Sequence, residues 1–183
     1  MRLLRWTLLV VVLLVGGAEI VVPQLAEAKI EEGVRERVRE QARVKADLGV
    51  FPVVTRYVIT GEVPELEVTL REVLGQEVPI GTVRFALEGV SLDRSALAQR
   101  DVEVTDIDSG VVTAEIALAT LDAPIDPGAV EVAGRRLDLG PGLTLALPRE
   151  LVPCEPSSEV RNDRVVLTCT IDEVPSILVR SAT

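Results

Sequence analysis

Hydrophobic residues recur every four positions in the first quarter of the chain. The repeating positions are Val22, Ala26, Ile30, Val34, Val38 and Ala42. Glutamates and arginines fill most of the positions between them, which is typical of a helix with one apolar side. The pattern predicts one amphipathic helix in this region.

Beyond Asp47 the spacing of hydrophobic residues changes from four to two. Alternation of apolar and polar residues runs through 65–71 and again through 82–88. Strict alternation indicates strands with one buried face and one face in water. Since the two segments follow each other along the chain, the sequence predicts a sheet with one apolar face.

Turn residues divide the rest of the chain into short strands. Asp108-Ser109-Gly110 separates two segments, 102–107 and 111–118, which we predict to pair as an antiparallel hairpin. Residues 91–100 fit either a short helix or a loop. Later strands are expected at 130–133, 136–139 and 143–147, and as two arms around Asn162-Asp163 that end near Ile171. The predicted architecture is α+β, with one helix lying on an antiparallel sheet.

The N-terminus has the pattern of an export signal. Arg2 and Arg5 precede an apolar run that begins at Trp6 and ends at Ala18. This run is short for a bilayer span of about 20 residues but normal for a signal sequence. The alternative, a buried first helix of the fold, is disfavoured because paired arginines before such a run are poor core material.

Two sites with small residues fit cleavage of this segment. One lies before Glu19, and the other lies before Lys29, inside the helical pattern. We therefore predict a signal peptide or membrane anchor at residues 1–18, with cleavage possible as late as residue 28. A single extracytoplasmic domain is expected at residues 19–183.

The amino-acid composition excludes several classes of function. The formal net charge is −10, and beyond the first apolar run Phe51, Tyr57 and Phe85 are the only aromatic residues. Binding of nucleic acid needs a basic face and stacking side chains, so a nucleic-acid partner is not expected. The chain has no histidine, which excludes Ser-His-Asp, Cys-His and HExxH chemistry. We predict that the protein is not an enzyme and has no cofactor.

The two cysteines, Cys154 and Cys169, are too few for a zinc site and do not form a CxxC motif. In an exported chain they predict one disulfide, with two free thiols as the alternative. Acidic residues near 101–108 raise the possibility of a Ca²⁺ site. Their alternation with valines favours the exposed face of a strand instead, and we expect no metal.

The segment 48–63 carries a resemblance to a known family. Gly49, Pro52, Thr55 and Gly61 fall on the spacing that is typical of the LmeA-like phospholipid-binding family of exported actinobacterial proteins. Two positions depart from that pattern, because Val50 is an extra residue and Arg56 stands where an amide is common. The resemblance covers most of the chain.

The resemblance implies a tubular lipid-binding type of fold, in which a long helix packs on a curved antiparallel sheet and leaves an apolar groove for acyl chains. It also implies phospholipid and the membrane surface as partners, and a role in envelope lipid or lipoglycan assembly. Protein partners are not identified. The alternative function is an envelope interaction module that binds a protein through an edge of its sheet.

Candidate site residues follow from this implied fold. The expected groove residues are Ile30, Val34, Val38, Phe51, Val54, Tyr57, Val58 and Phe85. For the helix stripe the competing interpretation is core packing, and for Phe51 and Tyr57 it is a buried hinge. Arg43 and Arg56 are the candidate residues for contact with a lipid head group, because an anionic group near so acidic a body needs local cations.

Overall fold

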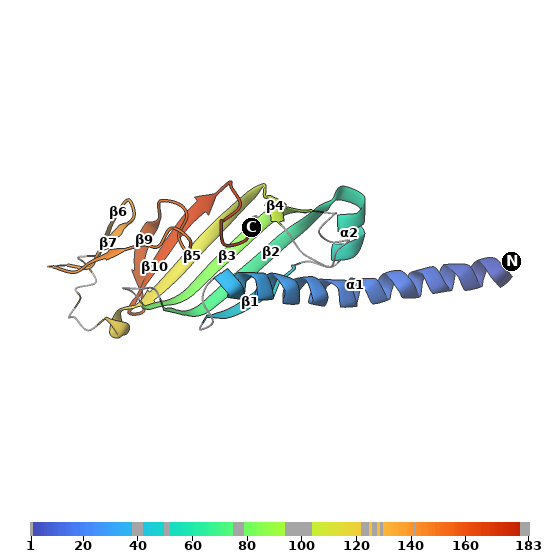
Figure 1. The fold of residues 1–183 in the computed structure, drawn as a ribbon, viewed down its shortest axis with the longest axis horizontal. Coiled ribbons are helices and arrows are strands. Elements are labelled where there is room, and N and C mark those ends of the chain that lie inside the picture. The colour runs from blue at the N-terminus through green and yellow to red at the C-terminus, as the bar shows by residue number, and fades with distance from the viewer. Residues whose placement is uncertain are drawn as a thin grey trace.

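The computed structural model describes residues 2–37, 42–49, 52–74, 79–93, 104–121, 125, 128, 130–140 and 142–179. Figure 1 shows the arrangement of the elements. In chain order they are α1 (Arg2–Arg37), β1 (Arg43–Asp47), α2 (Val53–Thr60), β2 (Glu62–Leu74), β3 (Pro79–Leu92), β4 (Val104–Asp106), β5 (Ser109–Ala117), the 3-10 turn η1 (Leu118–Thr120), β6 (Glu131–Ala133), β7 (Arg136–Asp138), β8 (Thr144–Ala146), β9 (Ser157–Arg161) and β10 (Arg164–Ile171).

The strands form two antiparallel sheets. The large sheet has the order β1-β2-β3-β5-β10-β9, with β4 also paired to β3. A small sheet has the order β6-β7-β8. The prediction of an α+β fold with a long N-terminal helix and an antiparallel sheet is confirmed. The predicted short strands near 130–147 are confirmed too, but they form a sheet of their own that the sequence did not indicate.

Helix α1 is one continuous helix of 36 residues, about 54 Å long at 1.5 Å per residue. We expected its apolar run and its amphipathic part to be separate segments, yet the helix passes through Pro23 without ending. Its C-terminal part lies along the large sheet, and its N-terminal part projects beyond α2 (Figure 1). Over the residues described, no helix has both the length and the apolar character needed to cross a membrane.

The predicted end of this helix was wrong. We expected it to continue to Ala42, but α1 ends at Arg37 and β1 begins at Arg43. Ala42, Val44 and Ala46 are buried while the residues between them are exposed. Ala42 fits the four-residue spacing of the helix, and it also fits the two-residue spacing of Val44 and Ala46. Because Val44 and Ala46 belong to β1, which pairs with β2, the fold follows the two-residue spacing at this point.

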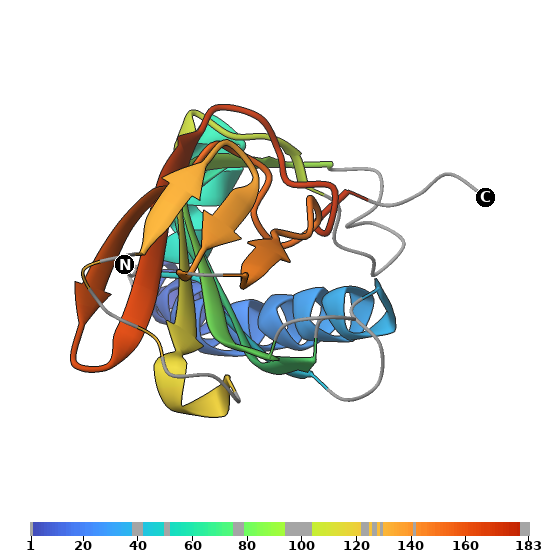
Figure 2. The same cartoon turned by 90° about the vertical axis from the view of Figure 1, so that its left-hand side faces the viewer.

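The large sheet has one apolar and one polar face. Most of the buried apolar side chains of its four longest strands come from alternate positions, among them Leu66, Val68, Leu70, Val83, Phe85, Leu87, Val112, Ala114, Ile116, Val165 and Leu167. Helix α1 and the small sheet lie on the same side of the large sheet (Figure 2), and their buried residues join these in one hydrophobic core. The polar face carries ion pairs between strands, such as Arg164 with Glu115.

The predicted hairpin around Asp108-Ser109-Gly110 was also wrong. Strands β4 and β5 both pair with β3, and so they act as one interrupted strand along it. Gly110 is buried, and a Cβ atom there would lie 2.7 Å from Leu87 Cδ2 and 3.0 Å from Ile171 Cγ1. This glycine permits close packing between strands and does not form the turn that its sequence context suggested.

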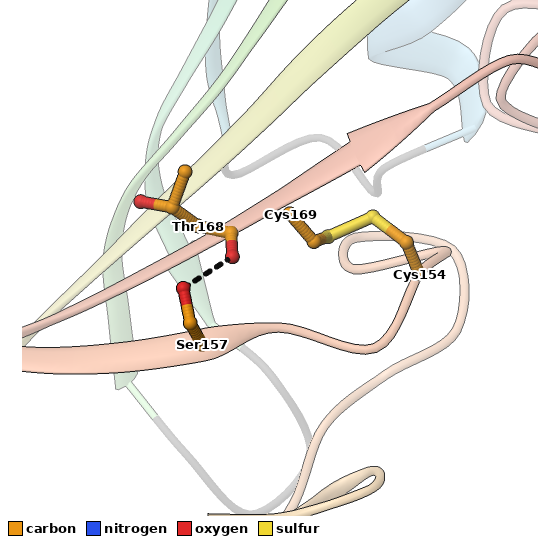
Figure 3. The surroundings of a disulfide bond; sticks show 4 residues. All are labelled: Cys154, Ser157, Thr168 and Cys169. Atoms are coloured by element: carbon orange, nitrogen blue, oxygen red, sulfur yellow. Dashed lines mark hydrogen bonds between the residues drawn. A yellow bond between two sulfur atoms is a disulfide. The ribbon is translucent and has the colours of Figure 1, made fainter.

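The predictions of a final hairpin and of a disulfide are confirmed. Asn162 and Asp163 both have positive φ and join β9 to β10, as a tight hairpin turn requires. Cys154 and Cys169 form the predicted disulfide, with their Cα atoms 5.9 Å apart. Figure 3 shows that the bond lies next to the hydrogen bond from Ser157 Oγ to the carbonyl oxygen of Thr168, 3.1 Å long, at the open end of the hairpin.

Candidate functional site

Three of the predicted groove residues lie together in the core. Ile30 and Val34 on α1 are 6% and 1% exposed, and Phe85 on β3 is fully buried. All three belong to the hydrophobic cluster between α1 and the apolar face of the large sheet. Val38 and Phe51 lie outside the described residues. The side chains of Ile30, Val34 and Phe85 therefore join α1 and the sheet in one hydrophobic core.

The other three predicted groove residues lie on α2, and they differ in exposure. Val54 is partly buried, and Tyr57 is partly buried and packs against the core. Val58 is 71% exposed, so it faces away from the buried set. Because residues four apart share one side of a helix, Val53, which is 7% exposed, and Tyr57 form the inward side of α2.

Tyr57 brings a polar atom into this apolar region. Its hydroxyl oxygen is buried and has no hydrogen-bond partner among the described residues. Buried polar atoms in folded proteins almost always have a partner, and each exception asks for an explanation such as a ligand or an ordered water. The phenol hydroxyl is able to donate one hydrogen bond and accept others. Tyr57 therefore presents an unused donor at the end of the apolar core.

Helix α2 has a sequence that does not favour a helix by itself. Six of its eight residues are β-branched, and eight residues are too few for a stable isolated helix. Pro52 at its N-cap offers no side-chain cap. At the C-terminal end Gly61, with φ of 84°, takes the left-handed conformation, and its N–H donates to the carbonyl oxygen of Tyr57 at 2.7 Å. The N-terminal end therefore needs a partner from elsewhere in the fold.

Glu19 of α1 is that partner. The N–H of Val54 donates to Glu19 Oε2 at 2.9 Å, and the N–H and hydroxyl of Thr55 donate to Oε1 at 2.6 and 2.5 Å. The carboxylate caps α2 from a distant helix, where negative charge also favours the helix dipole. Sequence reasoning missed this role. The signal available in the sequence was a single glutamate directly after a long apolar run. In the fold this glutamate is 6% exposed.

This cap predicts a pH-dependent effect. Burial raises the pKa of Glu19, but the hydrogen bonds from the first turn of α2 together lower it more, so its net pKa lies below the usual value. A lowered pKa in the folded state means that the charged carboxylate stabilises the fold above the ordinary carboxyl pKa. This stabilisation is lost as the pH falls through the lowered value.

We expect Glu19→Gln to lower the thermal unfolding temperature at neutral pH, because the neutral amide offers one acceptor oxygen in place of two. Amide exchange at Val54 and Thr55 should become faster in the variant. The difference from the native protein should shrink in acid, where Glu19 is protonated. Glu150→Gln, a change at an exposed glutamate, serves as control. Equal stability and equal exchange of the Glu19→Gln and native proteins at neutral pH would contradict the capping role.

Two further carboxylates of α1 bind the edge of the large sheet. Glu31 Oε1 accepts from the N–H of Ala46, and Glu27 Oε1 accepts from the N–H of Leu48, both at 3.0 Å. The glutamates are four residues apart on the helix, and the two N–H groups are two residues apart on or next to the edge strand β1. These bonds satisfy two N–H groups at the free edge and hold α1 along it.

The two predicted head-group cations lie far apart. Arg43 pairs with Glu72, with 3.3 Å between Nε and Oε2, and its position in the sheet is opposite Arg71. Arg56 lies on α2 and lines a surface pocket of about 320 Å³ with Glu65. Positions 65 and 71 of β2 are six residue steps apart, which corresponds to about 20 Å along the strand. The structure therefore does not bring Arg43 and Arg56 to one head group.

The pocket beside Arg56 is mainly acidic. Its other lining residues are Glu62, Pro64, Glu65, Glu88, Gly89 and Asp108. Within the described ranges, no group of three or more His, Cys, Asp or Glu is arranged to hold a metal ion. Asp101 and Glu103, which raised the question of Ca²⁺ together with Asp106 and Asp108, lie outside those ranges.

Comparison with known proteins identifies the family. Neither the curated proteins nor the solved structures gave a match. The family model described as LmeA-like phospholipid-binding matches residues 17–180, which includes almost all of the fold described above and confirms the resemblance. The chain belongs to the LmeA-like phospholipid-binding family.

Proposed function

We propose that this protein binds a phospholipid between α1, α2 and the apolar face of the large sheet, and that it works outside the cytoplasm without catalysis. Membership of a phospholipid-binding family supports the ligand class. The buried aliphatic side chains of α1 and β3 support the place, because acyl chains need apolar walls. Each acyl CH₂ group that leaves water contributes about 0.8 kcal/mol, which is enough for binding without any covalent step.

The unpaired hydroxyl of Tyr57 is the observation that carries this proposal. It is a buried donor next to an apolar core, without a protein partner among the described residues. A phospholipid has apolar chains joined to ester and phosphate oxygens, which accept hydrogen bonds. A lipid whose chains lie against the core would place such an oxygen at the boundary where Tyr57 stands. The hydroxyl would then have the partner that the described residues do not provide.

The sequence and the disulfide support a location outside the cytoplasm. Disulfides persist in oxidising compartments, and Cys154 and Cys169 are joined. We further propose that any cleavage of the N-terminal segment occurs no later than Ala18. Cleavage after Ala28 would remove Glu19 and Glu27, which cap α2 and bind β1. A role in envelope lipid or lipoglycan assembly, by carriage of lipid between sites, is consistent with such a protein.

The alternative of a protein partner bound at a sheet edge receives less support. On the β1 edge, the N–H groups of Ala46 and Leu48 already donate to α1. The opposite edge strand, β9, has five residues, so it offers a short row of hydrogen bonds. Phospholipid binding is the function that the described geometry favours.

Tyr57→Phe tests the proposal, because it removes the hydroxyl and keeps the ring. We expect the affinity for a fluorescent phosphatidylglycerol to fall by about 2- to 10-fold, the value of one hydrogen bond. The lipid-free protein should be as stable as the native protein or more so, since no described internal hydrogen bond is lost. Thr170→Val removes an exposed hydroxyl on β10 and should leave binding unchanged. Unchanged lipid affinity in Tyr57→Phe would contradict the proposed contact.

A further inference from the structure

The outward side of α2 carries two strongly exposed aliphatic side chains. Val58 is 71% exposed and Ile59 is 77% exposed, the two highest values among the large hydrophobic residues whose exposure is described. They are neighbours on a helix whose other side packs against the core. Exposed aliphatic groups that occur singly are ordinary, but adjacent ones at such exposure indicate a surface that meets an apolar partner.

Helix α1 carries further exposed aliphatic side chains. Val21, Val22 and Leu25 are 53%, 45% and 63% exposed, on the turns of α1 that directly follow Glu19. Because Glu19 binds the first turn of α2, the two helices are held together at this end of the molecule. From here α1 projects away from the sheet (Figure 1), and its sequence from Trp6 to Ala18 is almost entirely apolar. We call the residues Val21, Val22, Leu25, Val58 and Ile59 the apolar end.

The charge of this end differs from that of the whole chain. The formal net charge of the protein is −10. Over residues 16–26 and 53–60 there is one acid, Glu19, and one base, Arg56. The carboxylate of Glu19 is turned to α2 and is occupied by its hydrogen bonds. Acidic residues such as Glu62 and Glu65 line the pocket beside Arg56, so the near-neutral part of this end is limited to the two helical segments. These segments meet less repulsion from anionic lipids than the acidic remainder does.

We propose that the apolar end is the surface by which the protein docks on a phospholipid bilayer. The inference rests on the proposed function, and it adds the place of contact. Val58 and Ile59 enter the interfacial layer of the bilayer, while Tyr57 on the same helix faces the core. Helix α2 then stands between the bilayer and the lipid site, and a lipid that leaves the bilayer at this end meets Tyr57 first.

The test compares vesicle binding of full-length variants. We expect Val58→Ser combined with Ile59→Ser to weaken binding to vesicles of equal parts phosphatidylcholine and phosphatidylglycerol by about tenfold or more, because two aliphatic side chains lose their transfer to the bilayer. Val111→Ser is the matched control, since Val111 is a 42% exposed valine on β5. It should bind as the native protein does. Equal binding of the double variant and the native protein would overturn the proposal.

A second measurement does not depend on loss of binding. The two native cysteines are joined, so a cysteine at position 59 gives a single thiol for an environment-sensitive fluorophore. The emission of labelled Ile59→Cys should shift to the blue with vesicles, and that of labelled Val111→Cys should not. Absence of a shift at position 59 would also overturn the proposal, as would a loss of self-association in the double serine variant without any change in vesicle binding.

Failure of the proposed function has a separate signature. Phospholipid extracted from the purified native and double serine proteins reports the internal site, whereas vesicle binding reports the apolar end. If the native protein carries no phospholipid but its vesicle binding still depends on Val58 and Ile59, the internal site is wrong and the docking surface stands. If the double variant keeps its phospholipid and loses vesicle binding, both hold.

Discussion

Replacement of Phe85 by alanine should lower the free energy of unfolding by about 3–5 kcal/mol, the largest effect of any single substitution proposed here. Phe85 is fully buried in the middle of β3, between Val68 of β2 and Val112 of β5 in the sheet register. Both neighbours are buried too. Truncation leaves a cavity that the three paired strands cannot close. Urea denaturation of the lipid-free protein measures the change.

This experiment also distinguishes packing of Phe85 in the core from contact of Phe85 with bound lipid. Phe85→Leu keeps most of the side-chain volume and should cost less than about 1.5 kcal/mol. If Phe85 belongs to the packed core, Phe85→Ala destabilises the lipid-free protein by the full amount. If it lines only a space that lipid fills, the loss in the lipid-free protein should be small, and a value near that of Phe85→Leu would contradict core packing.

Removal of the disulfide should have the second largest effect. The bond between Cys154 and Cys169 closes a loop with a sequence separation of 15 residues. On the chain-entropy model, a loop of this size stabilises the fold by about 3 kcal/mol. For a protein of this length such a loss corresponds to a fall of roughly 6–12 °C in the unfolding temperature. Cys154→Ser combined with Cys169→Ser is the variant, and calorimetry is the measurement.

The same bond also holds the segment that precedes Cys154 against the core. Leu151 and Val152, close to Cys154, are 6% and 1% exposed, and the N–H of Val152 donates to the carbonyl oxygen of Pro148 at 2.9 Å. Without the disulfide, amide exchange at Val152 should become faster. A reducing agent should lower the stability of the native protein to that of the double serine variant and leave the variant unchanged. Equal stability of the oxidised and fully reduced native protein would contradict this account.

The sequence predicted the elements that depend on a regular pattern. Strands β2 and β3 follow from strict alternation around Val68 and Phe85, and the β9–β10 hairpin follows from Asn162-Asp163. The burial of Ile30 and Val34 on one side of α1 was also predictable, because it follows from helical periodicity.

The remaining features depend on contacts between distant segments. The cap that Glu19 supplies to α2 joins residues 35 or more positions apart, and no local pattern indicates such a bond. The paired roles of β4 and β5 depend on the length of β3, which offers partners to both. The exposure of Val58 was not predictable either, because the sequence of 50–59 does not indicate which side of the short helix faces the core.

Phospholipid content of the full chain tests the central claim most directly. The protein is purified without detergent, its lipids are extracted, and phospholipid and protein are quantified by mass spectrometry and amino-acid analysis. We expect phospholipid in a constant ratio to protein, reduced in Tyr57→Phe and unchanged in Thr170→Val. A native protein that is free of phospholipid and does not take up added phosphatidylglycerol would contradict it.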